Sequence, residues 1–301
     1  MKKDLLGLKD LPAETISAIL DRSFYFKREL EGKKRQELYP NKLLFTLFYE
    51  NSTRTKLSFQ SASQFLGLIT RDIAVATSSV QKGESLVDTG RTLDALYADV
   101  VVMRNSLSGS PHLLSKSIRA SVINAGDGMN EHPTQALLDL MTAKEAFGHL
   151  NGLNVLIAGD IKHSRVARSN IYGLKKLGAS VTLLAPPTLM PAGIESLGVK
   201  VSYKMDEAIA GADVVMPLRI QQERQEKGLL PSLGEFRMLY GFDEKCMAKA
   251  NKGAILLHPG PVNIGVELDF YLKYSKRSYI DTQVTNGVAV RMAVIDWLLS
   301  K

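Results

Sequence analysis

Short apolar runs alternate with amphipathic segments along most of the chain. Residues 43–49 and 100–103 have the length and the branched or aromatic side chains of buried strands. Between them, residues 56–67 place apolar side chains at helical spacing, and Gly67 offers a stop. Alternation of strand and helix is the signature of a parallel sheet covered by helices. The pattern therefore predicts an α/β fold.

The same alternation continues to the C-terminus. Apolar runs predict further strands at 69–76, 122–124, 153–158, 180–184, 199–203, 214–217 and 254–257. Segments with a helical period predict helices at 11–31, 85–97, 111–120, 136–147, 166–177 and 286–299.

A polar, glycine-bearing patch at 148–152 separates two halves of similar size. We predict two domains, each a parallel sheet flanked by helices. The first comprises residues 1–132 and 286–301, and the second comprises residues 150–280. Residues 133–148 form a linking helix, and the C-terminal helix crosses back to the first domain. A chain of 301 residues is long enough to form two domains, each with its own hydrophobic core.

Composition narrows the class of protein. The chain is 45% hydrophobic and 23% charged, as soluble globular proteins are, and its formal charge of +7 suits an acidic partner. The basic residues are dispersed apart from residues 33–35, and a small anionic substrate explains the charge as well as a nucleic acid does. No nucleic-acid motif appears, and no apolar run approaches the ~18 residues that span a bilayer, so we expect neither a nucleic acid nor a membrane as partner. A single cysteine, Cys246, excludes an intrachain disulfide and fits a cytoplasmic protein.

The most informative stretch is Ser52-Thr53-Arg54-Thr55, which lies between the strand at 43–49 and the helix after it. Hydroxyl groups and backbone N–H groups at a helix start bind anions, and an arginine beside them suits a phosphate. Taken alone, the four residues fit an ordinary helix cap with a solvated arginine equally well.

Other polar side chains also follow predicted strands, at the edge where open α/β sheets bind ligands. Each alone has a plainer explanation, such as a solvated arginine or a packed histidine. Together they predict a pocket for anionic reactants that works by positioning and by charge stabilisation. They are Arg54, Arg104, His132 and Gln135 in the first half, and Arg165, Arg219, Gln221 and His258 in the second.

Several common chemistries find no support. The turn at 159–165 lacks the glycine spacing of a dinucleotide-binding loop, and the sequence has no phosphate-binding Walker loop and no Gly-x-Ser-x-Gly nucleophile elbow. His132 and His258 have no companions at metal-ligand spacing. We therefore expect neither a cofactor nor a metal.

Four segments resemble motifs of the aspartate/ornithine carbamoyltransferase superfamily, and the resemblance spans nearly the whole chain. Residues 48–55 and 132–135 are similar to its two carbamoyl-phosphate signatures. Residues 159–169 and 218–224 are similar to the aspartate-binding loops of its aspartate-specific members. The resemblance implies transfer of the carbamoyl group from carbamoyl phosphate to the amine of L-aspartate. The products would be N-carbamoyl-L-aspartate and phosphate, in pyrimidine biosynthesis.

The resemblance also implies roles for individual residues. It gives catalytic roles to Arg54, Thr55, Arg104, His132 and Gln135. Carbamoyl phosphate would contact these five and also Ser52, Thr53, Ser78, Lys82, Gly260 and Pro261. Aspartate would contact Lys82, Arg165, Arg219 and Gln221.

Ser78 and Lys82 match residues that the superfamily contributes from a neighbouring subunit, so the resemblance implies a homotrimer with shared active sites. It leaves open an association with regulatory chains or with a dihydroorotase. One position departs from the pattern, because Ile264 stands where many relatives carry an arginine.

Two alternative functions remain at this point. The first is carbamoyl transfer to another amine such as ornithine, although Arg165 and Arg219 suit an acceptor with carboxylates better than one with a cationic side chain. The second is a non-catalytic basic protein that binds nucleic acid or serves as a scaffold for a dihydroorotase.

Overall fold

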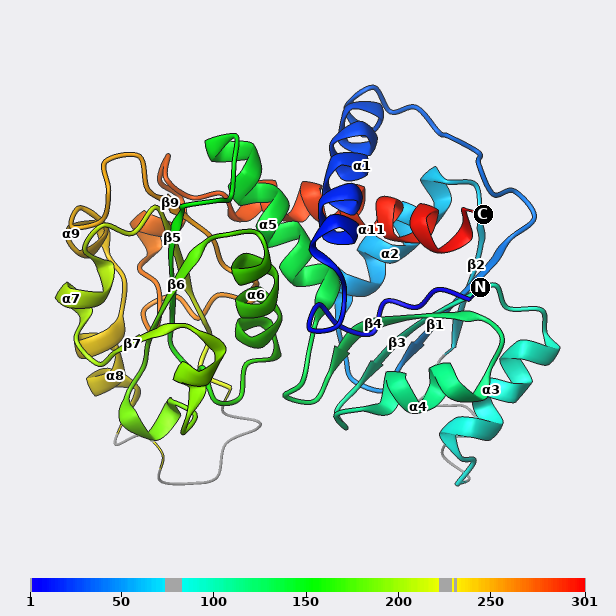
Figure 1. The fold of residues 1–301 in the computed structure, drawn as a ribbon, viewed down its shortest axis with the longest axis horizontal. Helices are drawn as coiled ribbons and strands as arrows, with labels where there is room; N and C mark the ends of the chain where they lie inside the picture. The colour runs from blue at the N-terminus through cyan, green and yellow to red at the C-terminus, as the bar shows by residue number, and fades with distance from the viewer. Residues whose placement is uncertain (1, 74–82, 222–228, 230–231, 301) are drawn as a thin grey trace. The chain divides into compact units, whose positions relative to one another are not determined.

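The computed structural model describes residues 2–73, 83–221, 229 and 232–300. The chain divides into two compact units. Unit 1 comprises Met1–Met141 and Thr285–Lys301, and unit 2 comprises Thr142–Val284 (Figure 1). Each unit contains one parallel sheet flanked by helices, which confirms the predicted fold class.

The sheet of unit 1 has the strand order β2-β1-β3-β4, and all its neighbours are parallel. These strands are β1 (Leu43–Phe48), β2 (Ile69–Ile73), β3 (Val100–Asn105) and β4 (Ser121–Asp127). Their carboxyl ends therefore meet at one edge of the sheet, where the turns that follow β1, β3 and β4 are neighbours.

Helices cover both faces of this sheet. One face carries α3 (Leu86–Ala95) and α4 (Ser110–Ser117), and the other carries α1 (Ala13–Glu31), α2 (Thr53–Phe65) and the end of α11 (Ile280–Leu299) (Figure 1). A buried apolar cluster contains side chains of the sheet together with side chains from α3, α4 and the segment after α4. It comprises Phe45, Leu47, Leu93, Val101, Met103, Leu114, Ile118, Ala120 and Val122. Burying each large side chain of this kind contributes about 1.5–3 kcal/mol.

The sheet of unit 2 is also entirely parallel, with the order β7-β6-β5-β8-β9. Its strands are β5 (Asn154–Ala158), β6 (Ser180–Leu184), β7 (Lys200–Ser202), β8 (Val214–Pro217) and β9 (Ile255–Leu256). The neighbouring strands β5 and β8 bring the segments after Ala158 and Pro217 side by side.

The helices of unit 2 again lie on both sides of its sheet. α6 (Arg165–Lys176) covers one side, and α7 (Met205–Ile209) and α9 (Glu244–Met247) lie on the other (Figure 1). α8 (Leu233–Tyr240) lies between α7 and α9 in the chain, and α10 (Phe270–Lys273) follows α9. The link between β6 and β7 carries 3₁₀ turns at Pro187–Leu189 and Ile194–Leu197. Cys246 is a buried free thiol in α9. No helix in the described ranges combines the length and the apolar character needed to cross a membrane.

The boundary between the units falls within α5 (Pro133–Phe147) and within α11. The end of α11 packs against unit 1, where Asp296 accepts hydrogen bonds from Arg22 Nε and from the Tyr39 hydroxyl, both at 2.7 Å. The predicted return of the C-terminal helix to the first half of the chain is therefore confirmed.

Two helices begin three or more residues earlier than the apolar period predicted. α2 begins at Thr53 instead of residue 56, and α11 begins at Ile280 instead of 286. The first turns of these helices are largely polar, so the apolar pattern starts only after them. The predicted apolar face of α2 was also wrong at Leu57, which is 56% exposed, whereas Ser63 is buried.

Candidate functional site

The start of α2 lies at the carboxyl end of β1. Ser52 has an extended backbone (φ −159°), and its side chain makes no capping hydrogen bond within the described chain. By contrast, Ser164 caps α6 by accepting from the backbone N–H of Ala167 at 3.1 Å. The first N–H groups of α2 carry the positive end of the helix dipole, so this turn can bind an anion.

Arg54 lies in the first turn of α2, next to these N–H groups. Its side chain is exposed overall, yet part of it is desolvated, and this lowers the pKa of its guanidinium from the ordinary value. The group stays a cation at neutral pH, because an arginine pKa starts far above that range. A phosphate at the start of α2 would therefore meet a full positive charge together with backbone donors.

Arg104 is held beside this turn by the register of the sheet. It pairs with Phe48 across β1 and β3, and its backbone carbonyl accepts from the N–H of Tyr49 at 2.9 Å. Its Nη2 donates to Glu50 at 2.7 Å, and its Nη1 donates to the carbonyl of Ala125 in β4 at 3.3 Å. These contacts fix the guanidinium between the segment that follows β1 and strand β4.

His132 and Gln135 follow β4 and begin α5. The buried carboxylate of Asp127 shapes the turn before them by accepting from the backbone N–H groups of Gly109 at 2.7 Å and Glu131 at 3.1 Å. His132 is 4% exposed and Gln135 is 8% exposed. Because β3 and β4 are neighbours, these residues share the edge of the sheet on which Arg104 lies.

Unit 1 thus brings most of its predicted site residues to one sheet edge. They are Ser52, Thr53, Arg54, Thr55, Arg104, His132 and Gln135. Ser78 and Lys82 lie outside the described residues.

In unit 2 a buried carboxylate ties two site loops together. Asp160, which follows β5, accepts from His163 Nδ1 at 2.8 Å through Oδ1 and from the backbone N–H of Gln221 at 3.1 Å through Oδ2. Gln221 lies in the loop after β8 and accepts from Arg219 Nη2 at 3.3 Å. Arg165, the first residue of α6, is only 3% exposed. Unit 2 therefore places Arg165, Arg219 and Gln221 at its own carboxyl edge.

The segment after β9 carries Gly260 and Pro261 and is braced from both ends. The backbone N–H of Gly260 donates to His258 Nδ1 at 2.8 Å, which leaves the ring proton on Nε2, 3.2 Å from Glu267 Oε1. The same Glu267 oxygen accepts from the backbone N–H of Asn263 at 2.6 Å. Ile264 is 46% exposed just beyond this braced segment.

Sequence reasoning missed the acidic residues that hold these groups. They are Glu50, Asp139, Asp160 and Glu267. One of them had a usable signal, because Asp139 stands four residues after Gln135 and residues at that spacing meet on a helix surface. Gln135 Nε2 does donate to Asp139 Oδ1, at 2.9 Å. The other three are brought to their partners by turns that no period reveals.

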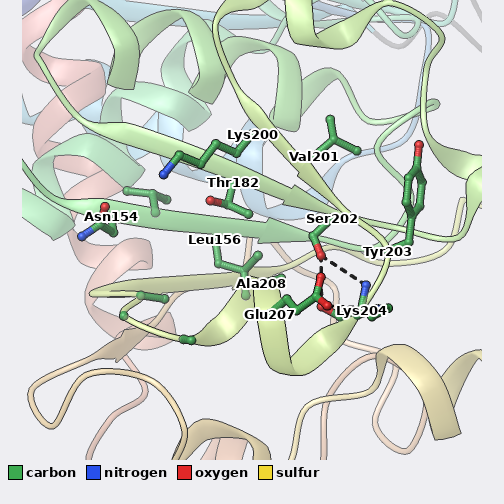
Figure 2. Close-up of a pocket in the computed structure, with 14 residues that line it drawn as sticks. Asn154, Leu156, Thr182, Lys200, Val201, Ser202, Tyr203, Lys204, Glu207 and Ala208 are labelled. Carbon is green, nitrogen blue, oxygen red and sulfur yellow. Dashed lines mark hydrogen bonds and ion pairs between the residues drawn. The ribbon is translucent and has the colours of Figure 1, made fainter.

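Unit 2 also has a surface pocket against β5, β6, β7 and α7 (Figure 2). Lys204 lies at its rim, and its ammonium is paired with Glu207 Oε1 at 2.9 Å. The pocket is not lined by Arg165, Arg219 or Gln221, so we do not assign it to the candidate site. Among the described residues, no group of three or more His, Cys, Asp or Glu side chains is arranged to hold a metal ion.

Comparison with known families covers nearly the whole chain. Residues 3–145 match "Aspartate/ornithine carbamoyltransferase, carbamoyl-P binding domain". Residues 151–298 match "Aspartate/ornithine carbamoyltransferase, Asp/Orn binding domain".

Individual relatives are similar to this chain in sequence over almost their full length. The chain is 56% identical over 301 residues to the aspartate carbamoyltransferase catalytic subunit of Caldanaerobacter subterraneus subsp. tengcongensis, covering 100% of this chain and 99% of the relative. It is 57% identical to the protein of the same name from Acetivibrio thermocellus, covering 99% and 96%.

Solved structures agree as well. Aspartate transcarbamoylase from Trypanosoma cruzi in complex with carbamoyl phosphate and aspartate superposes with a TM-score of 0.90 at 30% identity, covering 98% of this chain and 96% of that one. Ornithine carbamoyltransferase from Pyrococcus furiosus gives a TM-score of 0.87 at 27% identity, covering 98% and 96%.

The geometry of unit 2 makes one stability prediction. Gly159 follows β5 with φ +121°, and a Cβ there would overlap the carbonyl oxygen of Leu218, the residue before Arg219. Gly159→Ala should lower the free energy of unfolding by about 1–3 kcal/mol more than an alanine substitution at a positive-φ glycine with open space around it. The reason is that the backbone at Leu218 has to move to make room for the Cβ. Gly193→Ala is the matched control, with φ +71° and no atom within 4 Å of the added Cβ. Urea unfolding measures both variants, and equal losses would contradict the close approach.

Proposed function

This chain belongs to the aspartate/ornithine carbamoyltransferase family, and on that premise we propose how its residues carry out the reaction. It transfers the carbamoyl group of carbamoyl phosphate to the amine of L-aspartate, giving N-carbamoyl-L-aspartate and phosphate in pyrimidine biosynthesis. The amine nitrogen bonds to the carbamoyl carbon, the bond from that carbon to the phosphate oxygen breaks, and the departing phosphate takes the amine proton.

The phosphate of carbamoyl phosphate binds at the start of α2. Ser52, Thr53, Arg54 and Thr55 supply hydroxyl, guanidinium and backbone donors there, and Lys82 and Ser78 add to them. The uncapped helix start supports this assignment, because its N–H groups are not committed to the Ser52 side chain. Negative charge grows on the phosphate as it leaves, and Arg54 stabilises that charge.

The carbamoyl group lies across the turns after β3 and β4. Arg104, His132 and Thr55 donate to the carbonyl oxygen, which becomes an oxyanion as the amine attacks. One preset donor of this kind is commonly worth about 3–4 kcal/mol. The ion pair between Arg104 and Glu50 supports the role, because it preorganises the guanidinium before the substrate arrives. Gln135, Gly260 and Pro261 contact the carbamoyl NH₂.

Aspartate binds through Arg165, Arg219 and Gln221, with Lys82 contributing. The observation that carries the choice of aspartate is the acceptor chemistry of unit 2, where two arginines and the Asp160-braced Gln221 occupy one sheet edge. Guanidinium groups pair with carboxylates bidentately, and they repel the ammonium that the ornithine side chain carries.

The active unit in this proposal is a homotrimer in which each subunit lends Ser78 and Lys82 to its neighbour. Unit 1 exposes the large apolar side chains of Leu57, Leu96 and Tyr97, and this supports burial against another chain. A cytoplasmic location fits the single buried cysteine. Association with a regulatory chain or a dihydroorotase remains an expectation of the family resemblance.

Acceptor choice tests the proposed function. Purified protein with carbamoyl phosphate should carbamoylate aspartate and leave ornithine unreacted, as measured by product formation with each amine. Arg219→Ala should raise the KM for aspartate by roughly tenfold or more, since it removes a charge-assisted hydrogen bond. Lys204→Ala is the control, because that cation lies at the separate pocket of unit 2. Turnover of ornithine without turnover of aspartate would overturn the assignment.

Subunit exchange tests the shared site. Lys82→Ala and Arg104→Ala proteins should each be nearly inactive, and mixing them should restore activity at roughly a quarter of the sites, because a head-to-tail ring then forms some sites from two intact contributions. Mixing Arg54→Ala with Arg104→Ala is the control and should restore nothing, since both residues come from unit 1 of one subunit. If exchange is verified by mass and the first mixture stays inactive, the sites are not shared.

A further inference from the structure

A buried arginine in α11 contacts α2, one of the helices that begin at the proposed carbamoyl-phosphate site. Arg291 is 3% exposed, and its Nη1 donates to Ser58 Oγ in α2 at 2.9 Å and to the carbonyl of Gly287 at 3.0 Å. Its guanidinium lies over the ring of Phe59 in α2, 5.1 Å from the centroid. The roles proposed above leave this cation unused.

The buried guanidinium of Arg291 keeps its positive charge. Burial lowers the pKa of the guanidinium to about 10, and the carboxylate of Asp139 in α5 opposes that fall. The group is therefore a cation at neutral pH. A side chain at Gly287 would crowd it, because a Cβ there would lie 2.6 Å from Nη1. Asp139 is itself buried, so each charge compensates the other in a poorly hydrated interior.

Asp139 connects this pair to the site. Its Oδ1 accepts from Gln135 Nε2 at 2.9 Å. An ionised carboxylate only accepts hydrogen bonds, so Gln135 has to turn its NH₂ toward Asp139. The oxygen and nitrogen of an amide diverge from one trigonal carbon, so this orientation turns Gln135 Oε1 away from Asp139 and leaves it available to accept from a ligand.

We propose that Asp139 is a positioning residue for carbamoyl phosphate: it fixes the Gln135 amide so that Oε1 accepts from the carbamoyl NH₂, and the buried Arg291 balances its negative charge. The inference rests on the proposed role of Gln135. It also explains how the site selects its donor substrate, because acetyl phosphate has the same charge and a similar shape but carries a methyl group in place of the NH₂. A fixed acceptor favours the first ligand, whereas a rotating amide distinguishes the two poorly.

The test compares the dissociation constants of carbamoyl phosphate and acetyl phosphate for the full-length protein. In Asp139→Asn the new amide can offer its own NH₂ to Gln135, and in Arg291→Met the carboxylate loses its compensating cation. Both variants should lose roughly tenfold or more of the preference for carbamoyl phosphate, while acetyl phosphate binds as before. Arg291→Lys keeps the charge and should retain most of the preference.

Ser58→Ala separates positioning from stability. It removes the hydrogen bond between Arg291 and α2 but leaves Asp139 and Gln135 in place, so it should lower the thermal midpoint and leave the preference unchanged. If Arg291→Met does not fold, Asp139→Asn decides. A preference that survives in Asp139→Asn would overturn the inference. A wild-type protein that binds both ligands equally would instead overturn the proposed role of Gln135.

Discussion

The carboxyl edge of each sheet gathers polar and positively charged groups, and like charges repel one another, so in each unit these groups are held by oxygen acceptors. Two cations 4 Å apart near a protein surface repel by about 4 kcal/mol, so an unanchored arginine would turn into solvent. Glu50 holds Arg104, Asp139 holds Gln135, and Asp160 holds the backbone of Gln221, which in turn accepts from Arg219. These oxygen acceptors fix where the donors point before any substrate binds.

Each unit contains one parallel sheet, and the turns that follow its strands all lie at the same edge of that sheet. The two units then differ in how they use a helix start. Ser164 caps α6, which commits a backbone N–H to the chain itself, and in the proposed function side chains such as Arg165 bind the substrate in unit 2. Ser52 does not cap α2, so the backbone of unit 1 contributes donors as well. This difference suits a phosphate in unit 1 and carboxylates in unit 2.

Much of this arrangement could be predicted from the sequence. Alternating apolar runs predicted most strands of both sheets, because buried parallel strands are apolar along their whole length. Once the strands were predicted, the polar residues at or just after their ends, such as Arg104 and Arg219, could be identified as candidate site residues. The polar first turns of α2 and α11 were missed, since a helix start has no apolar period, and so was the exposure of Leu57. Anchors such as Glu50 and Asp160 could not be found, because their partners are set by sheet register and loop geometry.

The central claim is that Arg54 binds the phosphate of the substrate directly and does not merely add to the net charge. Calorimetric titration with carbamoyl phosphate compares wild type, Arg54→Ala and Arg119→Ala, where Arg119 is a largely exposed arginine of unit 1 beside Asp94. The account predicts that Arg54→Ala weakens binding by roughly 10- to 100-fold and that Arg119→Ala, with the same loss of charge, leaves it unchanged. Equal effects of the two substitutions would contradict it.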